Sequence, residues 1–111
     1  VCDDNRGAAQ LLGTLLENNG HRVTLAYTGQ EALARAKESQ PRIAILDIGL
    51  PDMDGYELAR RMQEVHPQVA LVALTGYGQD ADKSEAIVSG FNHHLTKPVG
   101  IAEVLELLNQ L

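Results

Sequence analysis

The sequence places one aspartate at the point where an apolar segment gives way to a turn. Asp47 follows the apolar run at residues 43–46, and Gly49, Pro51 and Gly55 come soon after it. A carboxylate at the end of a buried strand is held in place by the strand while one side of it stays open to solvent. Asp47 is therefore a candidate for a reactive carboxylate.

Polar side chains close other predicted strands as well. Asp3 and Asp4 end the first strand, Thr75 ends the fourth and Lys97 ends the fifth. The gaps from Asp47 to Thr75 and from Thr75 to Lys97 each hold one helix and one strand that return to the same edge. Because ligand sites of open α/β sheets lie beyond the carboxyl ends of the strands, we expect these side chains to meet.

Carboxylates gathered at one place repel one another, and a divalent cation relieves that repulsion. An all-oxygen ligand set favours a hard ion, and Mg²⁺ is typically held by one or two carboxylates and several waters. The predicted magnesium ligands are Asp3, Asp4, Asp47 and the backbone carbonyl of Gly49. The histidine pair His93-His94 is not expected to bind a metal, because adjacent strand residues point to opposite faces.

The remaining groups fit phosphoryl transfer, where catalysis consists mostly of positioning and of neutralising charge on the moving group. Asp47 is the predicted nucleophile, since carboxylates form covalent aspartyl-phosphates. Mg²⁺ and the Lys97 ammonium would be the cationic partners, and the Thr75 hydroxyl would donate a hydrogen bond.

Strands and helices alternate along the whole chain, which predicts a three-layer α/β sandwich with right-handed crossovers. Residues 43–46 and 69–74 are apolar on both faces, as is typical of central parallel strands. Only Val1 and Cys2 precede Asp3, so the first strand is either very short or begins upstream of this sequence. The other predicted elements are helices at 6–19, 28–39, 56–65, 83–89 and 104–111 and strands at 23–27 and 91–95.

Composition is that of one small globular domain. The chain has 111 residues, 44% hydrophobic and 22% charged, so we expect a single domain over residues 1–111, which is also compatible with a piece of a larger protein. A net charge of −6 without a basic block argues against nucleic-acid binding by this domain. One cysteine, Cys2, indicates a reducing compartment, and the absence of a long apolar run argues against a membrane span.

Four motifs together make the chain resemble the receiver domain of two-component response regulators and hybrid histidine kinases, over essentially its whole length. They are Asp3-Asp4-Asn5, the run Ile45-Leu46-Asp47-Ile48-Gly49-Leu50-Pro51-Asp52-Met53-Asp54-Gly55, Leu74-Thr75-Gly76, and Lys97-Pro98. The sequence segments that flank these motifs look most like those of receivers attached to hybrid histidine kinases. Within the motifs, Asp52 and Asp54 are assigned to turn and helix-cap roles, with Asp54 as the expected cap.

The resemblance implies a flavodoxin-like fold whose five parallel strands lie in the order 2-1-3-4-5. It implies that Asp47 accepts a phosphoryl group from a phosphohistidine on a histidine kinase or phosphotransfer protein, with Mg²⁺ bound, and that the bond before Pro98 is cis. The domain would then change shape, and could form a homodimer, at the face of its fourth helix, fifth strand and fifth helix. Its expected location is the cytoplasm, where a membrane-bound sensor kinase could tether it.

Three positions depart from the common receiver pattern or are expected to shape its kinetics. His94 stands where receivers usually carry the Tyr or Phe that turns inward with the threonine hydroxyl, so we expect a switch of Thr75 and His94 with an altered readout. Gly49 and Tyr77 occupy positions that control water access to the acyl phosphate. The ring of Tyr77 predicts slow hydrolysis.

Two other functions fit less well. A pseudo-receiver would keep the fold as a protein-binding scaffold without phosphorylation, but here the acids, Thr75 and Lys97 are all present. A turnover phosphatase of the haloacid dehalogenase type requires a second acid two residues after the nucleophile, where this chain has Gly49. The domain is thus expected to be a phosphoacceptor that assists its own phosphorylation and dephosphorylation, and not an enzyme that turns over a substrate.

Overall fold

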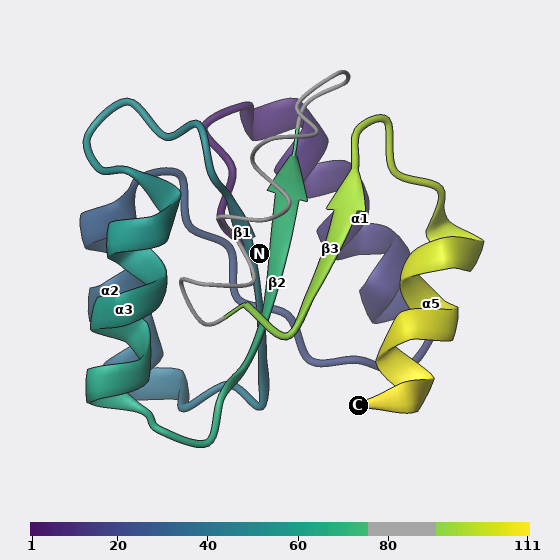
Figure 1. Ribbon diagram of the computed structural model, residues 1–111. Coiled ribbons are helices and arrows are strands. Elements are labelled where there is room, and N and C mark those ends of the chain that lie inside the picture. The colour runs from purple at the N-terminus through teal and green to yellow at the C-terminus, as the bar shows by residue number, and fades with distance from the viewer. Residues whose placement is uncertain (76–90) are drawn as a thin grey trace.

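The computed structural model describes residues 1–75 and 91–111, and it contains a parallel sheet with helices on both sides (Figure 1). The strands are β1 (Ile43–Asp47), β2 (Ala70–Thr75) and β3 (His93–Thr96). The helices are α1 (Arg6–Asn18), α2 (Gly29–Ser39), α3 (Gly55–Val65) and α5 (Ile101–Gln110). The helix predicted at residues 83–89 lies outside the described residues.

The sheet runs in the order β1-β2-β3, with every pair parallel. Ile45 pairs with Val72, and Leu74 pairs with Leu95. Residues 71–75 of β2 are all buried, as the apolar pattern on both faces predicted for a central strand. Parallel pairing brings the carboxyl ends of all three strands to one edge of the sheet.

The first two predicted strands are present only as single bridges. Cys2 pairs in parallel with Ala26 on one side and with Leu46 on the other. If the five predicted strands are numbered 1 to 5 along the chain, they therefore lie in the sheet in the order 2-1-3-4-5. The flavodoxin-like fold is confirmed. The expectation of a regular strand at residues 23–27 was wrong, because its neighbour offers only Val1, Cys2 and Asp3 for pairing.

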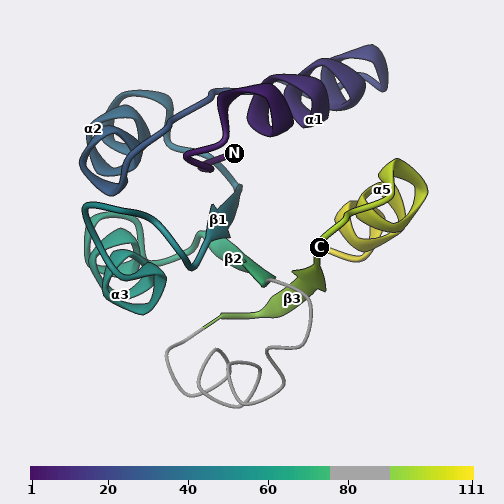
Figure 2. The same ribbon diagram turned by 90° about the horizontal axis from the view of Figure 1, so that it is seen from above.

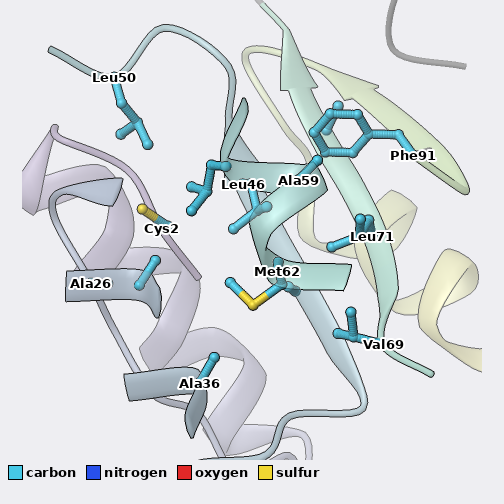
Figure 3. Close-up of a cluster of buried hydrophobic side chains, with 14 residues drawn as sticks. Cys2, Ala26, Ala36, Leu46, Leu50, Ala59, Met62, Val69, Leu71 and Phe91 are labelled. Atoms are coloured by element: carbon cyan, nitrogen blue, oxygen red, sulfur yellow. The ribbon is translucent and has the colours of Figure 1, made fainter. Parts of the chain in front are cut away.

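Within residues 1–75 and 91–111, two helices cover each face of the sheet. Figure 2 shows α2 and α3 on one side and α1 and α5 on the other. The apolar side chains form two clusters that match these layers. One joins α2 and α3 to the sheet and includes Leu58, Met62 and Leu71, and part of it is shown in Figure 3. The other joins α1 and α5 to the sheet and includes Leu16, Val72 and Val104.

Three of the described helices begin at a polar residue whose side chain caps them. Asn5 accepts from the Ala8 N–H at 3.1 Å, and Thr28 accepts from the Glu31 N–H at 3.1 Å. The Glu31 carboxylate accepts from the Tyr27 N–H at 2.8 Å, one residue before the cap. Asp54 caps α3, as expected.

Asp52 has a role that sequence spacing could not reveal. Its two carboxylate oxygens accept from the N–H groups of Gly29 at 2.9 Å and Gln30 at 3.2 Å, at the start of α2. The chain segment between β1 and α3 is thereby fastened to a helix more than twenty residues earlier in the sequence. These N–H groups, Gly29 first, hold the pKa of Asp52 below its usual range.

Gly55 is required by a close approach of two backbone segments. A Cβ atom there would lie 2.3 Å from the Ile48 Cα and 2.8 Å from the Ile48 Cβ. We expect Gly55→Ala to lower the free energy of unfolding by about 1–3 kcal/mol, because the backbone must shift to admit the methyl group. Urea unfolding followed by circular dichroism measures this.

The matched control is Gly7→Ala, also in the first turn of a helix, where a Cβ would meet only Asn5 Oδ1 at an ordinary 3.6 Å. Gly7→Ala should leave stability unchanged or raise it. Equal effects of the two substitutions would contradict the packing argument.

The cap from Asp52 should make stability depend on pH. Because the folded-state pKa of Asp52 is lowered, its contribution is present above the unfolded pKa and is lost as the pH falls through the folded pKa. Asp52→Asn should therefore destabilise the protein near pH 7, by about 0.5 kcal/mol for an exposed charge at a helix amino end. The difference from wild type should close on acidification.

Thermal unfolding from pH 7 down to pH 3 measures that difference. Glu64→Gln removes another exposed carboxylate, on α3, and serves as the control. A gap for Asp52→Asn that stays constant over the whole pH range would show that the charge of Asp52 does not stabilise α2.

Candidate functional site

Three charged side chains from distant parts of the chain meet at the carboxyl edge of the sheet. Lys97, just after β3, places its Nζ 3.1 Å from Asp47 Oδ2 and 3.2 Å from Asp3 Oδ2. Asp3 follows the bridge residue Cys2, and Asp47 ends β1. The structure thus brings together three of the side chains that were predicted to meet because they follow strand ends.

Both carboxylates are almost fully buried, and backbone groups orient them. Asp47 is 7% exposed, and its Oδ1 accepts from the Gly49 N–H at 2.9 Å, which leaves Oδ2 for Lys97. Asp3 is 3% exposed, and its Oδ1 accepts from the Asn5 N–H at 3.0 Å. Each carboxylate therefore has one oxygen fixed by the backbone and one that faces the lysine.

Burial and charge pairing act in opposite directions on the pKa values of Asp3 and Lys97. Burial raises the pKa of Asp3, although the Asn5 N–H and Lys97 partly offset this effect. Desolvation by itself would lower the pKa of Lys97. Its hydrogen bonds to Asp47 and Asp3 and their charges outweigh that loss, so the pKa of Lys97 is raised and the amine is an ammonium at neutral pH.

Asp4 adds a third carboxylate to the cluster. Carboxylate oxygens of Asp3, Asp4 and Asp47 lie within 4.8 Å of one another. Three carboxylates against one ammonium leave an excess of negative charge, and all the donors are oxygens, so the set fits a hard divalent cation. Gly49 adjoins the cluster through its N–H, and its carbonyl stays a predicted fourth ligand.

Thr75 lies at the same edge, but its hydroxyl is not directed to the acids. The residue is 1% exposed, and its Oγ1 donates to the Leu95 carbonyl at 3.4 Å and lies 3.5 Å from Thr96 Oγ1. Both distances are long for hydroxyl hydrogen bonds, so the hydroxyl is held weakly. The backbone carbonyl of Thr75 accepts from the Lys97 N–H at 2.8 Å, which ties the lysine to the end of β2.

Three other residues, Pro98, His94 and Tyr77, were also predicted to have roles at the site. The Lys97–Pro98 peptide bond is cis. His94 is half-buried on β3, in register with Ala73 of β2. Tyr77 lies outside the described residues, so its effect on hydrolysis stays a prediction.

Sequence reasoning missed two contacts at the site. The Asn5 N–H donates to Asp3, although Asn5 belongs to the Asp-Asp-Asn motif, and the Thr96 hydroxyl contacts that of Thr75.

The arrangement suits chemistry at a single carboxylate. Asp47 is held rigidly, an ammonium lies beside its Oδ2, and an acidic group that fits a cation adjoins it. Cationic partners of this kind stabilise the negative charge that develops on a transferring phosphoryl group.

Among the described helices, none is both long and apolar enough to cross a membrane.

Comparison with known proteins gives a consistent result. The sequence-family model of the response regulator receiver domain matches residues 1–109 of the chain. An uncharacterized 14.6 kDa protein in the sodA1 3' region of Leptolyngbya boryana is 38% identical over 112 residues, with 99% of this chain and 86% of that protein covered. The KDP operon transcriptional regulatory protein KdpE of Escherichia coli strain K12 is 36% identical over 104 residues, with 94% of this chain covered.

The chain spans only 46% of the length of KdpE, and about half of the other transcriptional regulators it matches. Among solved structures, a CheY-like response regulator receiver domain protein from Methanospirillum hungatei JF-1 superposes with a TM-score of 0.91 at 28% identity, covering 98% of this chain and 87% of that chain. The receiver domain of NtrX from Brucella abortus superposes with a TM-score of 0.92 at 26% identity, with 98% and 92% covered.

None of these names mentions a hybrid histidine kinase, so the finer resemblance to receivers of hybrid histidine kinases stays a prediction. The fold, the strand-end motifs and the match over almost the whole chain agree with one another. The chain belongs to the response regulator receiver domain family, whose members are phosphoacceptors in two-component signal transduction.

Proposed function

We propose that the chain, acting as a single receiver domain over residues 1–111, accepts a phosphoryl group on Asp47. The donor would be a phosphohistidine of a histidine kinase or phosphotransfer protein, and the reaction would take place in the cytoplasm with Mg²⁺ bound. The observation that carries this proposal is the position of Lys97 Nζ, within 3.2 Å of both Asp47 and Asp3 and next to a group of three carboxylates.

The proposed reaction follows from the environment of Asp47. Its Oδ2, the oxygen that the backbone does not hold, attacks phosphorus while the P–N bond to the donor imidazole breaks. The bonding pair returns to the imidazole nitrogen, which takes up a proton. When bound by Asp3, Asp4, Asp47 and the Gly49 carbonyl, Mg²⁺ would supply positive charge to the phosphoryl oxygens.

Lys97 has a defined task in this reaction. Its ammonium pairs with Asp47 Oδ2 before transfer and can follow the negative charge onto a phosphoryl oxygen as the new O–P bond forms. The raised pKa of Lys97 supports this task, because the side chain keeps its charge at neutral pH. The domain thereby assists its own phosphorylation and dephosphorylation and needs no substrate pocket.

Thr75 and His94 would convert phosphorylation into a change of shape. The Thr75 hydroxyl bonds the Leu95 carbonyl at a long 3.4 Å, so it can turn toward a phosphoryl group at little cost. His94 lies one residue before Leu95, on β3. The change would reach β3, α5 and the helix predicted at 83–89, which is the proposed surface for partners and for a homodimer.

The pseudo-receiver alternative makes the opposite prediction about covalent chemistry. The full-length protein is to be incubated with Mg²⁺ and a small phosphodonor such as acetyl phosphate, and its intact mass recorded. We expect wild type to gain one phosphoryl group, Asp47→Asn to gain none, and chelation of Mg²⁺ to prevent the gain in wild type.

Asp54→Asn is the matched control, because Asp54 is an exposed aspartate in the segment after β1 and asparagine caps helices equally well. It should gain the group as wild type does. An unmodified wild type would favour the scaffold, and a modified Asp47→Asn would place the acceptor elsewhere.

His94→Tyr tests the proposed switch. An imidazole that swings inward buries a polar ring that needs a partner, whereas a tyrosine ring can bury its carbon face, so the two should give different phosphorylated states. We expect the amide shifts of β3 and α5 on phosphorylation, measured by two-dimensional NMR, to change in size or pattern in His94→Tyr.

The control is His93→Tyr, the adjacent half-buried residue on the other face of the same strand. It should preserve the wild-type shifts. If His94→Tyr also reproduces them, His94 is not part of the switch.

A further inference from the structure

A second threonine lies beside Thr75. Thr96 is the last residue of β3 and is the register partner of Thr75, the last residue of β2 (Figure 1). The next residue along the chain is Lys97, whose ammonium contacts Asp47. Thr96 has no task in the function proposed above, although it adjoins two residues that do.

The side chains of the two threonines lie on the same face of the sheet. Leu74 and Leu95, one residue earlier on each strand, belong to the apolar cluster on the α1/α5 side. Because side chains alternate along a strand, Thr75 and Thr96 point to the opposite face, which also carries His94. Their hydroxyl oxygens are 3.5 Å apart. The two hydroxyls are therefore immediate neighbours at the carboxyl edge.

The Thr75 hydroxyl has one proton to donate. Among the residues that the structure describes, two acceptors compete for it: the Leu95 carbonyl at 3.4 Å and Thr96 Oγ1 at 3.5 Å. Both acceptors belong to β3, so both hold the hydroxyl toward that strand. A hydroxyl that turns to a phosphoryl oxygen on Asp47 must give up both of them.

The two acceptors differ in origin. The Leu95 carbonyl belongs to the backbone and is present whatever residue occupies that position. The Thr96 hydroxyl is a side-chain group on a half-buried residue, and few residue types would supply it. The strength with which the Thr75 hydroxyl is held is therefore set in part by the residue at position 96.

We propose that Thr96 is a positioning residue that holds the Thr75 hydroxyl toward β3 and so raises the free energy of the phosphorylated shape relative to the unphosphorylated one. This role rests on the proposed function, because the hydroxyl gains a new partner only when Asp47 carries a phosphoryl group. Removal of the Thr96 hydroxyl should therefore strengthen the binding of a phosphoryl mimic. Replacement of a residue that merely supports the fold would weaken it.

A titration with a phosphoryl mimic tests this role. Beryllium trifluoride is added to the full-length protein at saturating Mg²⁺, and its Kd is measured from amide shifts in two-dimensional NMR. Thr96→Val keeps the branched shape without the hydroxyl, and Thr96→Ala also lacks it. We expect each to lower the Kd by about threefold, because one weak hydrogen bond is lost from the unbound state. Thr96→Ser, which keeps a hydroxyl, should retain the wild-type Kd.

A second background tests whether Thr96 acts through Thr75. In Thr75→Ala the hydroxyl that Thr96 holds is absent, so the further change Thr96→Val should leave the Kd of beryllium trifluoride unchanged. Thr24→Val is the matched control, because it removes the hydroxyl of an exposed threonine outside the acid cluster, and it should bind as wild type does. The Kd of Mg²⁺ alone should be the same in Thr96→Val as in wild type.

The possible failures can be told apart. If wild type binds beryllium trifluoride at Asp47 and neither Thr96→Val nor Thr96→Ala binds it more tightly, the role of Thr96 is overturned and the proposed function stands. An equal gain of affinity in the Thr75→Ala background, in Thr24→Val or for Mg²⁺ alone would also overturn that role. A wild type that binds no beryllium trifluoride would overturn the proposed function, and the role of Thr96 with it.

Discussion

The structure of the site depends on one ammonium shared by two buried carboxylates. Lys97 lies within 3.2 Å of Asp3 and of Asp47, which are 3% and 7% exposed. Without that positive charge, the two buried carboxylates at one edge would have no cationic partner of their own among the described residues. The same contact joins the amino-terminal segment, β1 and the chain after β3. A change in the register of any of these would separate the charges.

The parallel sheet makes this contact possible. Each crossover returns the chain to the same edge, so residues about fifty positions apart, such as Asp47 and Lys97, become neighbours. The backbone then finishes the positioning: Gly49 fixes one oxygen of Asp47, Asn5 fixes one of Asp3, and the Thr75 carbonyl holds the Lys97 N–H. The Asp52 carboxylate accepts a hydrogen bond from Gly29, which connects the loop after β1 to the start of α2. Asp47, the proposed acceptor, is therefore held in place by contacts from several parts of the chain.

Much of this could be predicted from the sequence, because strand ends, caps and buried strands leave local signals. The order of the elements, the cap at Asp54, and the convergence of Asp3, Asp47 and Lys97 all follow from such signals. The direction of the Thr75 hydroxyl does not, since it depends on the Leu95 carbonyl across the sheet. The role of Asp52 likewise depends on a contact with a distant helix. The regular strand expected at 23–27 was wrong because pattern alone does not show whether a strand has a neighbour.

The central claim is that Asp47, Lys97 and the acidic cluster act together on one phosphoryl group. The most direct measurement is a crystal structure of the protein grown with Mg²⁺ and beryllium trifluoride, which mimics a phosphoryl group on a carboxylate. We expect beryllium bound to an Asp47 oxygen, a fluorine within hydrogen-bond distance of Lys97 Nζ, and Mg²⁺ contacting Asp3 or Asp4 as well as Asp47. Beryllium on another residue, or an Asp47 adduct with Lys97 turned away and no metal at the acids, would contradict it.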